Sequence, residues 1–121
     1  MQLFSEGKKI HAFHQMQMDR IEKLKEFLQA DPHDAFVKHA LALEYVNLGE
    51  EALARRHWEE ILERDPSYVG SYYHLARLLE RTGQPALALQ WYEKGMAAAK
   101  AAGERKAYNE LQAAYEDLQD Q

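Results

Sequence analysis

The side chains of this 121-residue chain that are best suited to chemistry are its six histidines. His11 and His14 stand three residues apart, a spacing that places both imidazoles on one face of a helix, where they could bind a metal ion. A protein metal site normally has at least three ligands, and no third one follows nearby in the sequence. We therefore expect a surface pair of histidines, with no metal site and no cofactor.

Nucleophilic and phosphate-handling chemistry has little support. The chain has no cysteine, which excludes a thiol nucleophile, a thiolate metal site and a disulfide framework. Ser5, Ser67 and Ser71 lack the context of a nucleophile elbow, and the six glycines form no phosphate-binding loop. These residues predict a protein that is not an enzyme.

One tyrosine and one arginine are spaced for binding rather than for catalysis. Tyr73 directly precedes His74, and Arg77 follows Tyr73 by about one helical turn, so the three side chains could share one wall of a groove. Aromatic rings and arginine are enriched in binding hot spots, because they offer large apolar area and a planar fork of donors. We expect Tyr73 and Arg77 to anchor a partner.

Composition indicates one soluble domain. Hydrophobic residues make up 46% of the chain and charged residues 29%, as in ordinary globular proteins. The net charge of −5 argues against nucleic-acid binding, which needs a concentrated basic surface. No apolar run approaches the roughly 20 residues needed to span a membrane, and the first residues do not form a secretory signal. We expect a cytoplasmic protein that binds neither nucleic acid nor membrane.

The elements that position these residues come from an internal repeat. At an offset of 34 residues, nine identities relate 31–64 to 65–98. They are Asp31/Asp65, Pro32/Pro66, Leu41/Leu75, Ala42/Ala76, Gly49/Gly83, Ala52/Ala86, Leu53/Leu87, Ala54/Ala88 and Glu59/Glu93. Small, apolar and turn residues dominate this set, which indicates a repeated structural unit.

Each unit is predicted to contain two helices. The first helices are expected at about 35–48 and 68–82, with Asp34 and Ser67 as N-caps. Gly49 and Gly83 supply the left-handed conformation that ends a helix. The second helices are expected at about 51–64 and 85–100, with Pro85 in a first turn.

At these positions the chain resembles the tetratricopeptide repeat family, whose units carry a leucine, small residues and aromatics at fixed places. The matching residues are Leu41, Ala42, Tyr45, Ala54, Trp58 and Pro66 in the first unit, and Tyr72, Leu75, Ala76, Leu79, Ala88 and Tyr92 in the second. Three positions depart from the pattern. Lys38 stands where the family prefers an aromatic residue, Gly95 where it has alanine, and Lys100 where it has proline, so the last helix can run on towards Gly103.

The flanking segments extend the same scheme. Residues 18–34 are predicted to form a degenerate half repeat with a helix at 18–30, residues 35–68 and 69–102 the two repeats, and residues 103–121 a capping helix at about 104–119. Residues 1–17 are predicted to form a mobile N-terminal arm. The alternative is a short helix that packs on the stack through Leu3, Phe4, Ile10 and Phe13. The predicted fold is all-α, a short right-handed α-solenoid of antiparallel helix pairs with about six helices.

The resemblance also implies where a partner would bind, because first helices of this family line a concave groove. The implied partner-binding residues are His39, Leu43, Asn47, Tyr73, His74, Arg77, Tyr108 and Leu111. Family members that grip the C-terminal carboxylate of chaperones use a lysine and two asparagines there. Those positions hold His39, Leu43 and His74 in this chain, so that clamp is not carried over.

Two functions follow as expectations. The first is a protein-interaction module that binds a peptide segment of a partner protein in the concave groove. The alternative is structural self-assembly as a homodimer, without a peptide ligand, through the ends of the stack or the arm at residues 1–17. Repeat pattern fixes the scaffold, whereas the identity of the partner is not encoded in it.

Overall fold

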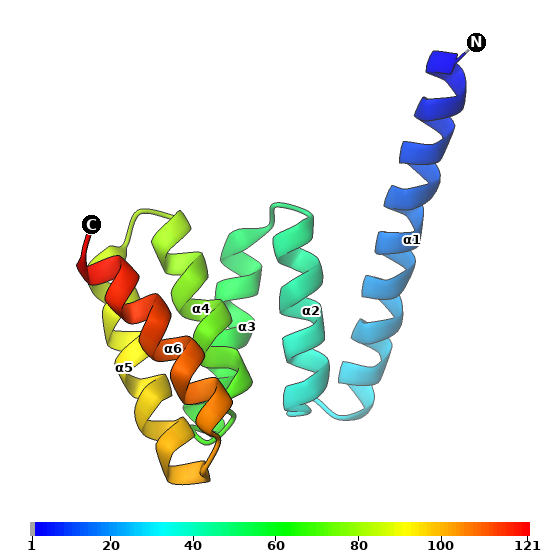
Figure 1. Ribbon diagram of the computed structural model, residues 1–121. Coiled ribbons are helices and arrows are strands. Elements are labelled where there is room, and N and C mark those ends of the chain that lie inside the picture. Colours follow the sequence, from blue (N-terminus) through cyan, green and yellow to red (C-terminus); the bar gives the residue numbers. More distant parts are fainter. Residues whose placement is uncertain (1) are drawn as a thin grey trace.

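The structure is a computed structural model that describes the backbone of residues 2–121 and the side chains of residues 8–121. The described residues form six α-helices and no strand, as predicted. The helices are α1 (Gln2–Ala30), α2 (Ala35–Asn47), α3 (Glu51–Arg64), α4 (Gly70–Arg81), α5 (Pro85–Ala102) and α6 (Arg105–Gln119). Figure 1 shows them in chain order from α1 to α6. Within the described part of the chain, no helix has the length and apolar character of a transmembrane segment.

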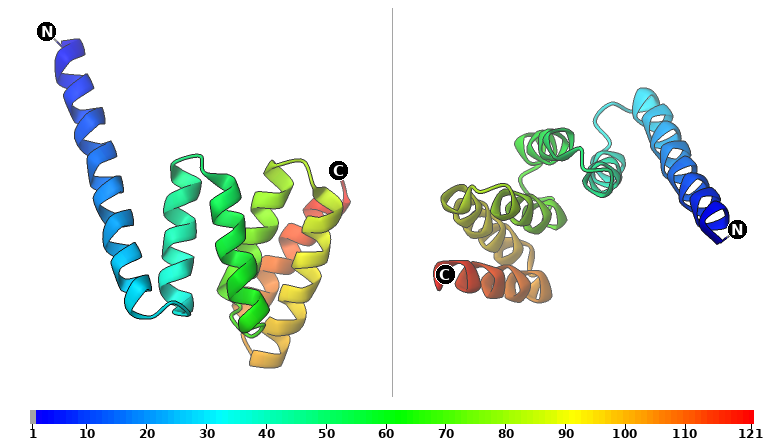
Figure 2. Two further views of the ribbon diagram at one scale, coloured as in Figure 1. Left: turned by 180° about the vertical axis from the view of Figure 1, so that it is seen from behind. Right: turned by 90° about the horizontal axis from the view of Figure 1, so that it is seen from above.

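Successive helices pack side by side in antiparallel pairs, so that each one contacts mainly its neighbours in sequence. Seen from above, α2, α4 and α6 follow one side of the stack, whereas α3 and α5 follow the other (Figure 2). We call the first side the inner face. This arrangement is the all-α solenoid that the repeat predicted.

The helix ends follow local chemistry. Asp34 caps α2, because its side chain accepts a hydrogen bond from the backbone N–H of Val37 at 3.1 Å. Gly49 and Gly83 both have φ of 80°, the left-handed conformation predicted for them. The predicted cap Ser67 is wrong, because α4 begins at Gly70 and the Ser67 N–H instead bonds the Asp65 carboxylate at 3.2 Å.

Alternating large and small side chains build the core between the two layers. Trp58 and Tyr92 are fully buried, and alanines such as Ala42 and Ala76 let neighbouring helices approach closely around them. Tyr72 is buried as well, and its hydroxyl donates a hydrogen bond to the carbonyl of Pro66 at 2.6 Å. Three of the repeat identities, Leu41/Leu75, Ala42/Ala76 and Ala54/Ala88, lie in this packed core.

Helix α1 is longer than the predicted helix at 18–30. It runs from Gln2 to Ala30 and contains no proline that would break it, and Gly7 is its one glycine. Its C-terminal half packs on α2 through Ile21, Leu24 and Leu28, and its N-terminal half projects beyond the rest of the stack (Figure 1). The mobility expected for residues 1–17 stays a prediction, and the side chains of Leu3, Phe4 and Ser5 lie outside the described residues.

A glycine in α5 sets the position of α6. A Cβ atom on Gly95 would lie 2.7 Å from the Tyr72 Cβ and 3.1 Å from both methyl carbons of Leu111. The absence of a side chain at Gly95 therefore lets α6 pack closely on α5. Since Lys100 does not stop it, α5 continues to Ala102 and ends at Gly103, as expected.

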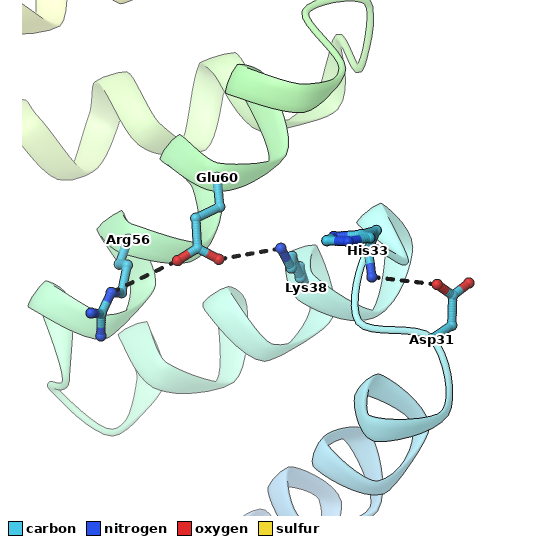
Figure 3. A network of polar contacts seen from close by, with 5 residues as sticks. All are labelled: Asp31, His33, Lys38, Arg56 and Glu60. Atoms are coloured by element: carbon cyan, nitrogen blue, oxygen red, sulfur yellow. Dashed lines mark hydrogen bonds and ion pairs between the residues drawn. The ribbon is translucent and has the colours of Figure 1, made fainter.

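Lys38, the departure from the family pattern in the first repeat, is a buried charge. Its Nζ lies 3.2 Å from a carboxylate oxygen of Glu60 on α3, and Arg56 approaches the other oxygen at 3.7 Å. Figure 3 shows this chain of contacts, beside the bond that the His33 N–H makes to Asp31 in the α1–α2 turn. A buried cation needs such a partner, because burial without one is strongly unfavourable.

Candidate functional site

The inner face is lined by some side chains that were predicted from the sequence and by others that were not. Its most accessible part follows one stripe on each of three helices. The stripes comprise Phe36, Leu43 and Asn47 on α2, Tyr73, His74 and Arg77 on α4, and Glu110, Ala113 and Asp117 on α6.

His39 ties the two repeats together beneath this face. The indole N–H of Trp58 donates a hydrogen bond to His39 Nδ1 at 3.0 Å, and the Ser71 hydroxyl lies 3.0 Å from the same nitrogen. An indole N–H can only donate, so His39 Nδ1 must accept and carries no proton. This hydrogen-bond network assigns the imidazole as neutral, with its proton on Nε2.

The surroundings of His39 keep it neutral well below its ordinary range. Burial, and to a smaller extent the charge of nearby His74, lower the pKa of His39 to about 4. His74 has its ring centroid 5.2 Å from that of His39, and burial lowers its pKa as well. The two histidines therefore contribute neutral, half-buried rings rather than cations at neutral pH.

Tyr73 and Arg77 lie together, as their spacing predicted. Both line a hollow of about 580 Å³ between α4 and α6, whose opposite wall is formed by Glu110, Ala113, Ala114 and Asp117. The Tyr73 ring packs edge-on against His74 at 5.8 Å. Arg77 is half exposed, and its guanidinium lies 3.4 Å from the largely buried carboxylate of Glu80, which also accepts a hydrogen bond from the Tyr92 hydroxyl. The acidic opposite wall was not foreseen.

The α2 part of the inner face is apolar. Leu43 and Asn47 are exposed there, as expected, and Phe36, about two helical turns before Leu43, is 72% exposed. Phe36 was not among the predicted binding residues, although the spacing of 36, 43 and 47 places the three residues on one stripe of α2. This face therefore presents an exposed phenylalanine and an exposed leucine on the same helix.

Two predicted partner-binding residues lie elsewhere. Leu111 is 1% exposed and fills the space beside Gly95, so it supports α6 and cannot touch a partner. Tyr108 does not join Tyr73 and Arg77. It lines a separate hollow of about 610 Å³ at the α5–α6 turn, together with Lys100 and Arg105. Both predictions assumed that α6 presents the same face as α2 and α4, whereas α6 is rotated to bury Leu111 and Leu118.

The histidine pair in α1 stands apart from this face. His11 and His14 are both exposed on the projecting half of the helix. The side chains described from residue 8 onward include no group of three or more histidine, aspartate or glutamate residues placed to hold a metal ion.

Comparisons with known proteins agree with this architecture. A sequence model of the tetratricopeptide repeat family matches residues 57–90. A TPR repeat-containing protein of Pseudomonas aeruginosa is 29% identical over 91 residues, which cover 75% of this chain and 87% of that protein. The family features are therefore present in sequence as well as in structure.

Solved structures extend the likeness. The solution structure of a tetratricopeptide repeat domain protein from Salinibacter ruber is 39% identical, covers 73% of this chain and 89% of its own, and has a TM-score of 0.70. The TPR2B domain of yeast Sti1, solved as a complex with pHsp70, covers 93% of this chain and 90% of its own with a TM-score of 0.79. Its identity is 17%, so that likeness concerns the fold alone.

Proposed function

The chain belongs to the tetratricopeptide repeat family, and from this premise we propose that it binds a peptide segment of a partner protein on its inner face. Members of this family act in general as protein-interaction modules. One observation carries the proposal. The inner face combines exposed apolar side chains on α2 with a hollow that holds Tyr73 and Arg77 on α4.

The side chains of this face also suggest the chemistry of the segment. Phe36 and Leu43 would receive apolar residues of the partner, because both are exposed on one stripe of α2, about two helical turns apart. Glu110 and Asp117 would attract a lysine or arginine of the partner across the hollow from Tyr73. The guanidinium of Arg77 would pair with a carboxylate of the partner. The proposed ligand therefore carries apolar residues, an acidic group for Arg77 and a basic one for Glu110 or Asp117.

The proposed binding requires no catalysis, no cofactor and no nucleic acid. We propose that it acts without catalysis or cofactor, since preorganised shape and a few anchors suffice for binding. With a net charge of −5, we also propose that its partner is a protein rather than a nucleic acid and that it works in the cytoplasm. The second candidate, self-assembly, is favoured by a different surface, on α1.

A quantitative pull-down with three forms of the protein tests the inner face. The forms are the wild type, a Tyr73→Ala/Arg77→Glu variant, and a control variant Gln90→Ala/Lys94→Glu. The control makes the same change in charge at exposed positions of α5, on the outer side. Proteins captured by the wild type and the control but lost with the first variant would support the proposal.

The segment of such a protein is then synthesised as a peptide and measured by calorimetry. We expect Phe36→Ala to weaken its binding at least about tenfold, as for a hot-spot residue. If all three forms capture the same proteins, the inner face is not the binding site and the proposal is wrong.

A further inference from the structure

Helix α1 exposes more large apolar side chains than the solenoid needs. Phe13 is 61% exposed, Met16 57% and Phe27 53%, and the three lie on one side of the helix. The other end of the stack differs, because the outer side of α6 is polar, as expected of a terminal helix in contact with water. The α6 end of the solenoid therefore presents a polar surface to solvent, whereas the α1 end presents an apolar one.

The exposed side of α1 has the spacing of a helix–helix seam. We define the α1 stripe as six residues separated alternately by four and three positions, which is the heptad spacing of two packed helices. They are Lys9, Phe13, Met16, Arg20, Lys23 and Phe27. The stripe spans about 27 Å of helix. It lies to one side of Ile21 and Leu28, the residues that pack on α2, so it stays open in the folded chain.

We propose that the α1 stripe is the contact surface for a second copy of this chain, with the two α1 helices antiparallel. The register follows from the stripe, whose positions are symmetric about residue 18. Lys9 then faces Phe27 of the second copy, Phe13 faces Lys23 of the second copy, and Met16 faces Arg20 of the second copy. Each lysine then meets an aromatic ring, which is a favourable contact for a cation, and Arg20 meets the flexible Met16 side chain.

The charges exclude the parallel arrangement. Two parallel helices in register would place Lys9, Arg20 and Lys23 each against its own copy, where like charges repel. In the antiparallel register none of these three cations directly faces another cation. Arg20 is in addition partly neutralised by Glu44 of α2, which lies 3.3 Å from its Nε. The same register brings Lys8 near Glu26 of the second copy at the edge of the seam.

The size of the surface fits a reversible dimer. Two helices in contact over this length bury on the order of 1,000 Å² in total, which is the low end for specific protein interfaces. Because each copy offers the same stripe, the contact is isologous and closes as a dimer rather than growing into a filament. The inner face stays open, so this inference is independent of the proposed peptide binding.

Sedimentation equilibrium over a wide range of protein concentration tests the dimer with charge variants of the stripe. We expect the wild type to dimerise, and Phe13→Lys/Phe27→Lys to raise the dissociation constant at least tenfold, because lysine then faces lysine. Phe13→Glu/Phe27→Glu is expected to stay within tenfold of the wild type and to become salt-sensitive, because each glutamate then faces a lysine. Far-UV circular dichroism checks that each variant is folded.

The control variant His11→Glu/Gln29→Glu makes the same substitution at two exposed positions on the opposite side of α1 and should leave the dissociation constant unchanged. A wild type that stays monomeric at all concentrations overturns the proposal. Equal loss of dimer with the lysine and the glutamate variants also overturns it, because the register would then be wrong.

Cysteine cross-linking gives a second reading of the register, since the natural chain has no cysteine. Under mild oxidation, a mixture of Phe13→Cys and Lys23→Cys proteins should form the mixed disulfide faster than either protein forms its own. Faster formation of the Cys-to-Cys homodimer by Phe13→Cys alone would indicate a parallel pair and contradict the proposal.

Discussion

Replacing His39 by asparagine should make the protein less sensitive to acid. In the folded chain the Trp58 N–H donates a hydrogen bond to His39 Nδ1, and burial lowers the pKa of His39 from its ordinary value of 6.5 to about 4. The unfolded chain has no such contacts, so its His39 binds a proton near the ordinary value. As pH falls from about 6.5 to about 4, His39 becomes protonated in the unfolded state but stays neutral in the folded state, so the free energy of unfolding falls.

The magnitude follows from the difference in pKa. A difference of about 2.5 units corresponds to an upper limit of about 3.4 kcal/mol. His39 is only partly buried, so solvent screening reduces the expected effect, and we take about 1.5 kcal/mol. Stability from this group is complete above the unfolded pKa and decreases below it. His57 and His74, whose pKa values are also lowered by burial, act in the same direction.

Urea unfolding followed by far-UV circular dichroism, at a series of pH values from about 7 down to about 4.5, measures the effect. Asparagine at position 39 can still accept the Trp58 N–H through its side-chain oxygen, but it cannot titrate. We expect the wild type to lose about 1.5 kcal/mol more than His39→Asn over this range. Parallel stability profiles of the two proteins would show that His39 titrates normally and would refute the reasoning.

Two further predictions concern packing. Gly95→Ala should lower the free energy of unfolding by about 1 kcal/mol, because crowding against Tyr72 outweighs the roughly 1 kcal/mol gained in helix propensity; equal or greater stability in urea unfolding would show that α5 and α6 adjust without strain. Glu60→Gln should destabilise the protein by about 1–2 kcal/mol, because it removes the carboxylate that pairs with buried Lys38, whereas Lys38→Met should be nearly neutral. Thermal unfolding of Glu60→Gln and Lys38→Met measures both effects. Equal losses of stability in the two variants would contradict the assignment of Lys38 and Glu60 as a buried ion pair.

The parts of the fold that the sequence predicted are those set by local chemistry or by the repeat. Gly49 and Gly83 end their helices because only glycine takes a positive φ without strain, so these turns could be read directly. Trp58 and Tyr92 occupy equivalent places one repeat apart, so their burial followed from the 34-residue offset. Repetition supplied two examples of each such position.

The missed features depend on contacts between elements that the repeat does not share. Leu111 packs against Gly95 of α5, and α6 is turned so that this side chain is buried. Aligning α6 with α2 and α4 at the 34-residue offset could not reveal this orientation. The apolar spacing of Ala107, Leu111, Ala114 and Leu118 was the available signal. The hydrogen bond from Trp58 to His39 joins side chains on different helices, so no local spacing pointed to it.

Helix α1 packs against the rest of the protein from one side only and should therefore detach more easily than the other helices. Its helix neighbour is α2, and Ile21 is the one described α1 side chain in the buried core. A helix held from one side can detach while the remaining repeats stay folded, because their contacts do not pass through it. Amide hydrogens of α1 should therefore exchange with solvent through a local opening, at lower free energy than those of α4. A contact that covers α1 would slow its exchange selectively, which makes this helix the most responsive reporter of binding in the molecule.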